Sequence, residues 1–326
     1  MTTIKDVAKQ ANVSVATVSR VLNQKGYVSK ESEEAVKKAI KILNYQPNAV
    51  ARSLYHKTSG IIGLFVPDIS NPFFPELARA VEDAATAEGF TVVLCNTDNK
   101  QDKEQKYIQV LQQKYADGLI IVTGTESVEH ILSTHIPVVA LDRYISEDIP
   151  TVVSSNKQGA IDATEHLVEQ GCTFIAHLRG PIGVTSADER YEGFKQVIEK
   201  HSMAHVVIDS GFEIGQSEMA TRKLLEMYPS IDGIFASSDV TAAGAMRAAY
   251  KCHKSIPTDI KVIGFDGISL GEMLTPALST VQQPIYDMGE RATKLLMTMI
   301  EKKELQSYRH EFKTKLTIRE TSVGGE

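Results

Sequence analysis

The chain has 326 residues, 42% of them hydrophobic, and a formal net charge of −6, and a chain of this length is expected to form about two or three domains with sizeable cores. It has no run of about 18 apolar residues that could cross a membrane, and its start, MTTIKDVAKQ, lacks the apolar segment of a signal peptide. Its three cysteines, Cys95, Cys172 and Cys252, lie far apart without metal-ligand spacing, as expected for buried thiols in the reducing cytoplasm.

Three short helices are expected at the N-terminus. Thr3 can cap the first helix, with Asp6 three residues later in the capping-box pattern. Residues 12–14 interrupt that helix, and a second helix is expected over 15–23. A third helix is expected over 29–43, where apolar residues recur at helical spacing.

The second of these helices has two different faces. Val18, Val21 and Leu22 are expected to turn inward, whereas small residues, hydroxyls and one arginine face outward, as in a helix that reads the major groove. The first 60 residues carry ten Lys and Arg against four acids, a net of +6, while the remainder carries 25 against 37, a net of −12. This asymmetry favours a DNA-binding helix-turn-helix over the alternative, a plain helical interaction module.

The stretch NYQPNAVARSLYHKTSG links this head to the rest of the chain. Pro47 ends the third helix, and Asn48 can cap a short helix over 49–54. About seven residues do not hold a helix alone in water, so this one is expected to fold when bound. Arg52 offers a phosphate or minor-groove contact and Leu54 an apolar wedge for a base step. The alternative is a solvated linker.

From residue 61 onward, apolar runs alternate with amphipathic segments, which predicts parallel sheets with helices on both faces. Their number suggests two similar doubly wound lobes. In such sheets ligands bind beyond the carboxyl ends of the strands. The apolar runs are 61–66, 91–95, 118–122, 137–141, 173–178, 205–208, 233–236 and 261–265.

Aromatic, amide and charged side chains follow these runs. Rings can cover an apolar sugar face, and arginine and carboxylate groups can bond adjacent hydroxyls. Each residue alone could serve as a turn or cap, but the set predicts a cleft for a small polar ligand. The motifs of common enzymes, such as G-x-S-x-G, the glycine-lysine phosphate loop, H-E-x-x-H and G-x-G-x-x-G, do not occur, so no catalysis is expected and neither metal nor cofactor is called for.

Several motifs together resemble those of the lactose/galactose repressor (LacI/GalR) family. They are Thr3–Asn23, Tyr45-x-Pro47-Asn48, Ala51-Arg52-Ser53-Leu54, Ile61-Ile62-Gly63, Asn71-Pro72-Phe73-Phe74, Gly264-Phe265-Asp266 and Gln283-Pro284. Within the family the core most resembles the ribose operon repressors and the related ribose-binding proteins.

The resemblance implies an α/β fold with an all-α helix-turn-helix head and a two-lobed, doubly wound core like that of periplasmic binding proteins. It implies a homodimer on a palindromic operator. The expected boundaries are 1–46 for the head, 47–59 for the hinge helix and linker, and 60–326 for the effector-binding core. Within the core, the N-lobe is expected at about 60–157 and 285–316 and the C-lobe at about 158–284.

Carried over position by position, the resemblance also implies functional residues. Those expected on DNA are Thr3, Ser14, Val15, Ala16, Thr17, Ser19, Arg20, Asn23, Tyr45, Asn48, Ala51, Arg52 and Leu54. Those expected on the sugar are Asn71, Phe73, Phe74, Asp142, Arg143, Arg190, Phe212, Ser238, Asp266 and Gln283. One position departs from the family, since Ser238 stands where an asparagine precedes the aspartate, and a hydroxyl offers fewer hydrogen bonds than an amide.

The resulting hypothesis is a repressor of a sugar operon, with ribose as the expected sugar, that the sugar releases from its operator. A regulator of the same family that needs a co-repressor, such as a purine or a phosphorylated carrier protein, is an alternative. A sugar-binding transport receptor is an alternative of another class, against which the DNA-binding head and the missing signal peptide argue.

Overall fold

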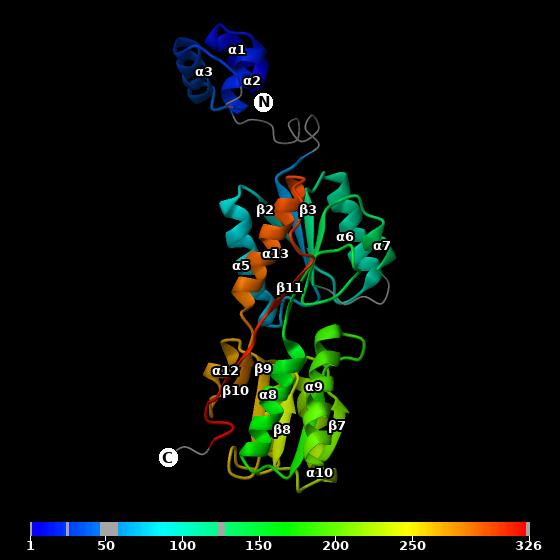
Figure 1. Ribbon diagram of the computed structural model, residues 1–326. Helices are drawn as coiled ribbons and strands as arrows, with labels where there is room; N and C mark the ends of the chain where they lie inside the picture. Colours follow the sequence, from blue (N-terminus) through cyan, green and yellow to red (C-terminus); the bar gives the residue numbers. More distant parts are fainter. Residues whose placement is uncertain (1, 24–25, 46–57, 123–127, 324–326) are drawn as a thin grey trace. The chain divides into compact units, whose positions relative to one another are not determined.

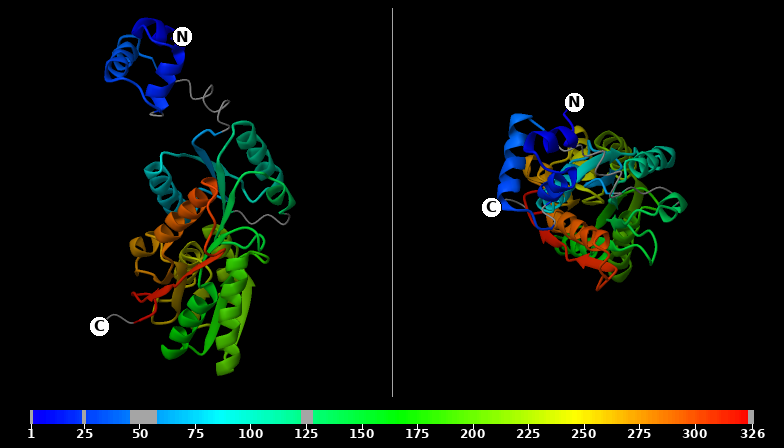
Figure 2. Two further views of the ribbon diagram at one scale, coloured as in Figure 1. Left: turned by 45° about the horizontal axis from the view of Figure 1, so that its top comes forward. Right: turned by 90° about the horizontal axis from the view of Figure 1, so that it is seen from above.

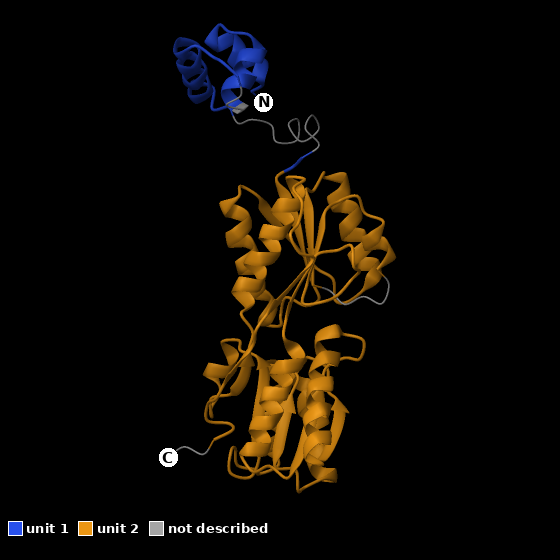
Figure 3. Ribbon diagram, viewed as in Figure 1, with its two compact units in different colours: residues 1–59 blue, residues 60–326 orange. Residues whose placement is uncertain are grey.

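The computed structural model describes residues 2–23, 26–45, 58–122 and 128–323. The chain divides into two compact units, residues 1–59 and residues 60–326 (Figure 3). The expected hinge helix, with Asn48, Ala51, Arg52 and Leu54, lies outside the described residues. No helix in the described ranges is long and apolar enough to cross a membrane.

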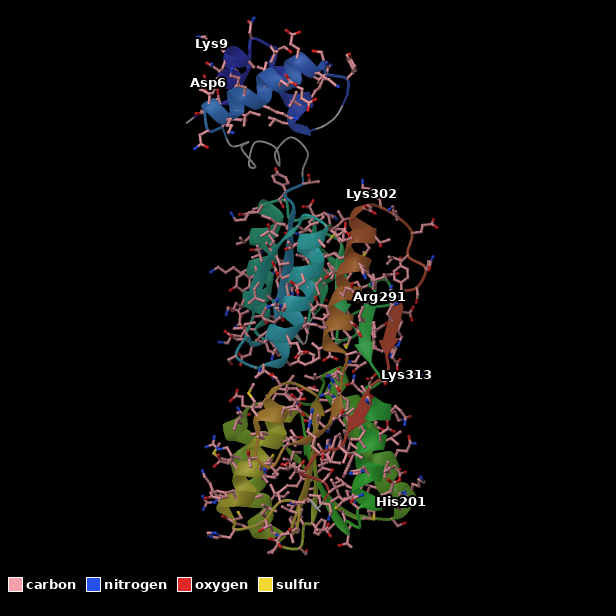
Figure 4. All side chains as sticks on the ribbon, turned by 90° about the vertical axis from the view of Figure 1, so that its left-hand side faces the viewer. Asp6, Lys9, His201, Arg291, Lys302 and Lys313 are labelled. Atoms are coloured by element: carbon pink, nitrogen blue, oxygen red, sulfur yellow. The ribbon has the colours of Figure 1, made fainter. Side chains whose placement is uncertain are left out.

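The first unit is the expected group of three helices. They are α1 (Ile4–Ala11), α2 (Val15–Asn23) and α3 (Lys30–Ile42). The capping box of α1 is present, because the Asp6 amide donates to Thr3 Oγ1 at 3.4 Å and the Thr3 amide donates to Asp6 Oδ2 at 2.8 Å. Asp6 and Lys9 are labelled on this helix in Figure 4. Asn12 ends α1 in the left-handed conformation, with φ of 51°. The small core is formed by Val7, Ala8, Val18, Val36, Ala39 and Tyr45.

The second unit contains two parallel sheets flanked by helices (Figure 1). The N-lobe sheet has the strand order β11-β5-β4-β3-β1-β2, and all its pairings are parallel. Its elements are β1 (Ile61–Val66), α5 (Phe73–Ala87), β2 (Thr91–Asn96), α6 (Gln101–Gln113), β3 (Gly118–Ile121), α7 (Glu129–Leu132), β4 (Val138–Leu141), β5 (Thr151–Ser154), α13 (Ile285–Ile300) and β11 (Arg309–Phe312).

The C-lobe repeats this arrangement with the order β12-β10-β9-β8-β6-β7. Only β12, which pairs with β10, is antiparallel. Its elements are α8 (Asn156–Glu169), β6 (Phe174–Arg179), α9 (Thr185–His201), β7 (Ala204–Asp209), α10 (Ile214–Met227), β8 (Gly233–Ala236), α11 (Asp239–Lys251), β9 (Lys261–Asp266), α12 (Leu270–Met273), β10 (Ser279–Gln282) and β12 (Lys315–Thr317).

The chain crosses between the lobes three times, after β5, after β10 and after β11. Figures 1 and 2 show the last crossing as the red segment that leaves the N-lobe. The Thr314 amide donates to Ser155 Oγ at 3.0 Å, which ties the third crossing to the first. The sequence had extended the N-lobe to about residue 316, whereas Lys315 and Leu316 pair with β10 of the C-lobe.

Helices α8 and α9 pack closely because Gly193 of α9 carries no side chain. A Cβ at this position would lie 2.3 Å from the Lys157 carbonyl oxygen and 2.8 Å from Ala160 Cβ. We expect Gly193→Ala to destabilise the C-lobe by about 1–3 kcal/mol, because the helices must move apart. The control is Gly215→Ala in α10, where no atom lies within 4 Å of the added Cβ. Thermal unfolding of both variants measures the difference, and equal stability would contradict the close packing.

Candidate functional site

The exposed side of α2 carries the residues expected to read DNA. Val15, Ala16 and Arg20 are exposed, while Val18 is fully buried. Thr17 and Ser19 are half-buried. This agrees with the two faces expected from the sequence. The arrangement presents one cation and small apolar side chains, which permits close approach to base edges.

The hydroxyl groups at the start of α2 are engaged with the helix itself. The Thr17 amide donates to Ser14 Oγ at 3.1 Å, and the two hydroxyls share a hydrogen bond of 2.9 Å. Ser14 therefore caps the helix, as Thr3 caps α1. The Tyr45 ring is 9% exposed and belongs to the core of the head. Asn23 ends α2, and its side chain lies outside the described residues.

In the second unit, polar side chains from both lobes meet where the chain crosses between them. We call Asp142, Ser154, Asn156, Arg190, Asp266 and Gln283 the inter-lobe cluster. Arg190, only 2% exposed on α9, lies at its centre. Its Nε donates to Asn156 Oδ1 at 2.9 Å, and its Nη1 donates to the Ser237 carbonyl at 2.6 Å and to Asp266 Oδ1 at 3.3 Å. The guanidinium also stacks on Phe265, 3.8 Å from the ring centroid.

Asp266 connects this arginine to the crossing segments. Gln283 Nε2 donates to Asp266 Oδ1 at 2.8 Å, and Gln283 Oε1 accepts from the Ser154 hydroxyl at 2.6 Å. Asp266 ends β9 with φ of 117°. Burial raises the pKa of Asp266 to about 7, and the charge of Arg190 only partly opposes this. The hydrogen-bonded chain thus runs from β5 of the N-lobe to β9 of the C-lobe.

Asp142 reaches the cluster from the N-lobe, directly after β4. Burial raises its pKa to about 6, while Arg190 and the Ser186 hydroxyl lower it. Its Oδ1 is buried and accepts no hydrogen bond within the described part of the chain, and the same holds for the hydroxyl of Ser237. Buried polar atoms without partners are rare in proteins. These two atoms are suited to bond the hydroxyls of a small ligand.

Asp239 supports the cluster without belonging to it. Its Oδ2 accepts from the amides of Gly267 and Ile268 at 2.8 and 2.9 Å, and its Oδ1 accepts from the Thr280 hydroxyl. It thereby fixes the turn after Asp266. Burial and the neighbouring charge of Asp266 raise the pKa of Asp239.

Ser238, expected among the sugar contacts, caps helix α11. Its Oγ accepts from the Thr241 amide at 3.0 Å and shares a hydrogen bond of 2.8 Å with the Thr241 hydroxyl. This occupies the hydroxyl in the helix cap, so a sugar contact from Ser238 remains a prediction.

The expected aromatic and amide contacts lie on different elements. Phe73 is 5% exposed within the N-lobe core, and the half-buried Phe74 meets it edge to face with centroids 5.2 Å apart. Asn71 Oδ1 accepts from the Phe73 amide at 3.1 Å at the start of α5. Phe212 belongs to the other lobe, where its ring lies over Gly180. The expected sandwich of three rings around a sugar therefore remains a prediction.

Arg143 feels the charge of a different carboxylate, and its Nη1 is buried without a hydrogen-bond partner in the described part of the chain. It is 8% exposed, burial lowers its pKa, and the carboxylate that opposes this shift is Glu104 of α6. Glu104 is itself buried and bonds His130 Nε2 at 2.6 Å. Among the described residues, no hydrogen bond or ion pair joins Arg143 to the inter-lobe cluster.

The sequence did not lead us to expect three residues of this region in the site. Ser154 ends the strand β5, directly after the run of residues 151–153, and Asn156 lies two residues beyond it; this strand also went unrecognised. The polar sequence Ser154-Ser155-Asn156 directly after that run was the available signal. Ser237 was noted in its loop but was not placed in the site.

Two family models match the chain. Residues 3–48 match "Bacterial regulatory proteins, lacI family". Residues 59–320 match "Periplasmic binding proteins and sugar binding domain of LacI family".

Individual proteins resemble the chain over most of its length. A protein of Halalkalibacterium halodurans named "ribose operon repressor" is 64% identical over 326 residues, which cover all of this chain and 98% of that protein. The lac repressor dimer bound to operator and an anti-inducer is similar in structure, with a TM-score of 0.89, 26% identity and 99% of each chain covered. A LacI family regulator from Enterococcus faecium with bound ribose has a TM-score of 0.75 and 29% identity, with 82% of this chain and all of that chain covered.

Proposed function

This chain belongs to the LacI family of bacterial regulatory proteins, and we propose that it is a DNA-binding transcriptional repressor of a ribose utilisation operon. A small sugar, ribose or a related pentose, binds the inter-lobe cluster and releases the repressor from its operator. The protein acts in the cytoplasm and carries out no catalysis. The 64% identity to a ribose operon repressor over the whole chain supports this function.

One structural observation carries the sugar assignment. The buried Asp142 Oδ1 accepts no hydrogen bond in the described chain and lies within the influence of the Arg190 charge. A sugar hydroxyl donates to such an oxygen and satisfies it. Because Asp142 belongs to the N-lobe and Arg190 to the C-lobe, a sugar bonded to both holds the lobes together.

The proposed division of labour follows the boundaries expected from the sequence. Residues 1–46 bind DNA, 47–59 form the hinge and 60–326 bind the effector. We propose that sugar-induced closure changes how the N-lobes pack across the dimer, so that the hinge segments no longer meet on the operator. Only a difference in sugar affinity between the two states can drive this change.

Operator binding titrated with ribose tests the function. At one fixed salt concentration, fluorescence anisotropy of a labelled operator fragment should report binding without sugar and release at saturating ribose. Unchanged or tighter binding with ribose would contradict induction and favour the co-repressor alternative. The salt concentration must be held constant because phosphate contacts make the affinity salt-dependent.

We propose that the homodimer uses the edge strand β2 of the N-lobe. β2 ends the sheet order, and Val93 and Leu94 on it are 37% and 41% exposed. An open edge with exposed apolar side chains is suited to an interface between copies.

Leu94→Lys should therefore yield monomers at micromolar concentration, since it places a charge in that interface. Loss of dimerisation should also lower the affinity for the operator, because a monomer has one head and binds only a half-site. Analytical sedimentation measures the mass of each variant. The control is Leu132→Lys, because Leu132 on α7 is also exposed, at 50%. A Leu94→Lys variant that remains dimeric would place the interface elsewhere.

A further inference from the structure

We propose that Glu104 and His130, a buried pair inside the N-lobe, position Arg143 so that this arginine can bond the sugar. This rests on the proposed function, in which ribose binds where the two lobes meet. Glu104 and His130 do not touch the sugar themselves, and both act through Arg143. Ribose affinity is then set in part by two residues on helices α6 and α7, behind the site.

The loop that follows β4 is packed together with α6 and α7. Ile108 of α6, Ile131 of α7 and Ile145 of the loop belong to one apolar core. Within this packing Glu104 is fully buried and the His130 side chain is 6% exposed, with His130 Nε2 2.6 Å from Glu104 Oε1. Because an ionised carboxylate can only accept, His130 Nε2 carries the proton of this bond.

Arg143, at the start of that loop, depends on the charge of Glu104. Its guanidinium is largely removed from water, since the residue is 8% exposed. Burial lowers the pKa of Arg143, and the charge of Glu104 opposes this shift. A buried charge without a counter-charge is costly. Glu104 therefore allows a charged arginine to stay inside the lobe at this position.

Arg143 still has a donor to offer. Its Nη1 is buried without a hydrogen-bond partner in residues 2–23, 26–45, 58–122 and 128–323, and so is Oδ1 of the preceding Asp142. Asp142 turns the chain after β4 in the left-handed conformation, with φ of 55°. Two consecutive residues thus leave one donor and one acceptor unsatisfied at the carboxyl end of a parallel strand, where ligands bind. A sugar hydroxyl both donates and accepts, so sugar hydroxyls can satisfy both atoms.

His130 limits how Glu104 can act on Arg143. Arginine and carboxylate groups favour a two-pronged ion pair, which would occupy the donors of Arg143 and withhold them from the sugar. The bond from His130 occupies Glu104 Oε1. Glu104 then supplies Arg143 with a counter-charge and leaves Nη1 for the ligand.

A double-mutant cycle on the full-length protein tests the positioning role. Calorimetry gives the ribose affinity of the parent, Glu104→Gln, Arg143→Met and the double variant. We expect ribose binding to weaken about 10-fold in Glu104→Gln and about 10- to 100-fold in Arg143→Met, because a charged donor is misplaced or lost. The double variant should match Arg143→Met within about twofold, since Glu104 acts only through Arg143.

The cycle has two outcomes that contradict the positioning role. If the two effects multiply in the double variant, Glu104 acts on the fold of the N-lobe rather than through Arg143. If Arg143→Met binds ribose as the parent does, Arg143 does not touch the sugar. Either result overturns the proposal. The control is Glu129→Gln on α7, which removes an exposed charge and should leave ribose affinity unchanged.

His130→Phe tests the pair with the charge of Glu104 intact, and it decides the question if Glu104→Gln does not fold. The substitution keeps a planar ring but removes the donor, so that Glu104 is free to pair with Arg143 directly. Ribose affinity should fall by about 3- to 10-fold, while the melting temperature of the sugar-free protein stays within a few degrees of the parent's. The control is His135→Phe, because His135 is exposed. Full ribose affinity in His130→Phe would overturn the role of the pair.

The same measurements separate this role from the function on which it rests. If the parent binds its operator but not ribose, the ribose assignment fails and the positioning role fails with it. If the parent binds ribose and the effects of Glu104→Gln and Arg143→Met are independent, the proposed function stands and the positioning role alone is wrong.

Discussion

Asp266→Asn should shift the response to ribose to about 10- to 100-fold higher ribose concentrations, while making the sugar-free protein more stable at pH 8. The substitution keeps the shape of the side chain, and an amide oxygen can still accept from Gln283 and Arg190. It removes a buried negative charge whose burial raises the pKa of Asp266 to about 7. One substitution is therefore expected to lower the affinity for ribose and to raise the stability of the sugar-free protein.

The stability effect has a defined dependence on pH. Because the pKa of Asp266 is raised from 3.8 to about 7, the folded state holds a proton that the unfolded state has lost. Stability from this group is therefore greatest at low pH and falls as pH rises from about 4 to about 7. The melting temperature of Asp266→Asn should come closest to that of the parent near pH 4 and exceed it by a few degrees at pH 8. A gap that is the same at both pH values would contradict the raised pKa.

The same substitution is expected to lower the affinity for ribose. A charged acceptor contributes about 1.5–3 kcal/mol per hydrogen bond, so loss of the ionised carboxylate should weaken ribose binding by about 10- to 100-fold. Ionised Asp266 is the better acceptor for sugar hydroxyls, and affinity of the parent protein should accordingly rise between pH 6 and pH 8. Calorimetry measures the ribose affinity of the variant and the pH dependence of the parent's affinity. The control is Asp148→Asn, because Asp148 is exposed. Full ribose affinity in Asp266→Asn would remove this residue from the site.

Local patterns predicted much of this fold. The capping box of Thr3 and Asp6, the interruption at Asn12 and the eight apolar runs depend on neighbours in sequence, and the structure confirms each as a helix, a helix end or a strand. Strands β5, β11 and β12 have only three or four residues and little periodicity. Strands β11 and β12 pair with segments more than 30 residues away, β5 and β10 respectively. Pairing of that kind is not visible in a local pattern.

In the candidate site, too, the sequence predicted the residues that follow recognisable strands and missed those whose position depends on strand pairing. Loops after strands pointed to Asp142, Arg190, Asp266 and Gln283, because the carboxyl ends of parallel strands share one edge. The partner Ser154 ends β5 and the partner Asn156 lies two residues beyond it. Neither could be placed until that strand was known to lie beside β4. Ser238 shows a further limit, since serine is suited both to cap a helix and to bond a sugar, and the residue type alone did not show that its hydroxyl caps α11.

Arg20→Ala should weaken specific operator binding by about 100-fold or more, while sugar binding is unaffected. Arg20 is the exposed cation of α2, and an arginine on a base edge is worth about 1–3 kcal/mol of discrimination. Because a dimer places two such helices on a palindrome, the loss counts twice. Binding to non-operator DNA should fall much less, since it depends on phosphate contacts.

Lys41→Ala on α3 provides a control of equal charge, as Lys41 is exposed on another helix of the head. If Arg20 only contacts phosphate, Arg20→Ala should lower operator and non-operator affinity alike and reduce the salt dependence by about one ion. A base contact instead lowers the ratio of the two affinities. Ribose affinity of the free protein should be the same in all three proteins, because the cluster that we propose as its binding site lies in residues 60–326. By linkage, operator DNA must lower ribose affinity by the same factor by which ribose lowers operator affinity. At a DNA concentration that saturates only the parent protein, Arg20→Ala should therefore bind ribose more tightly than the parent does.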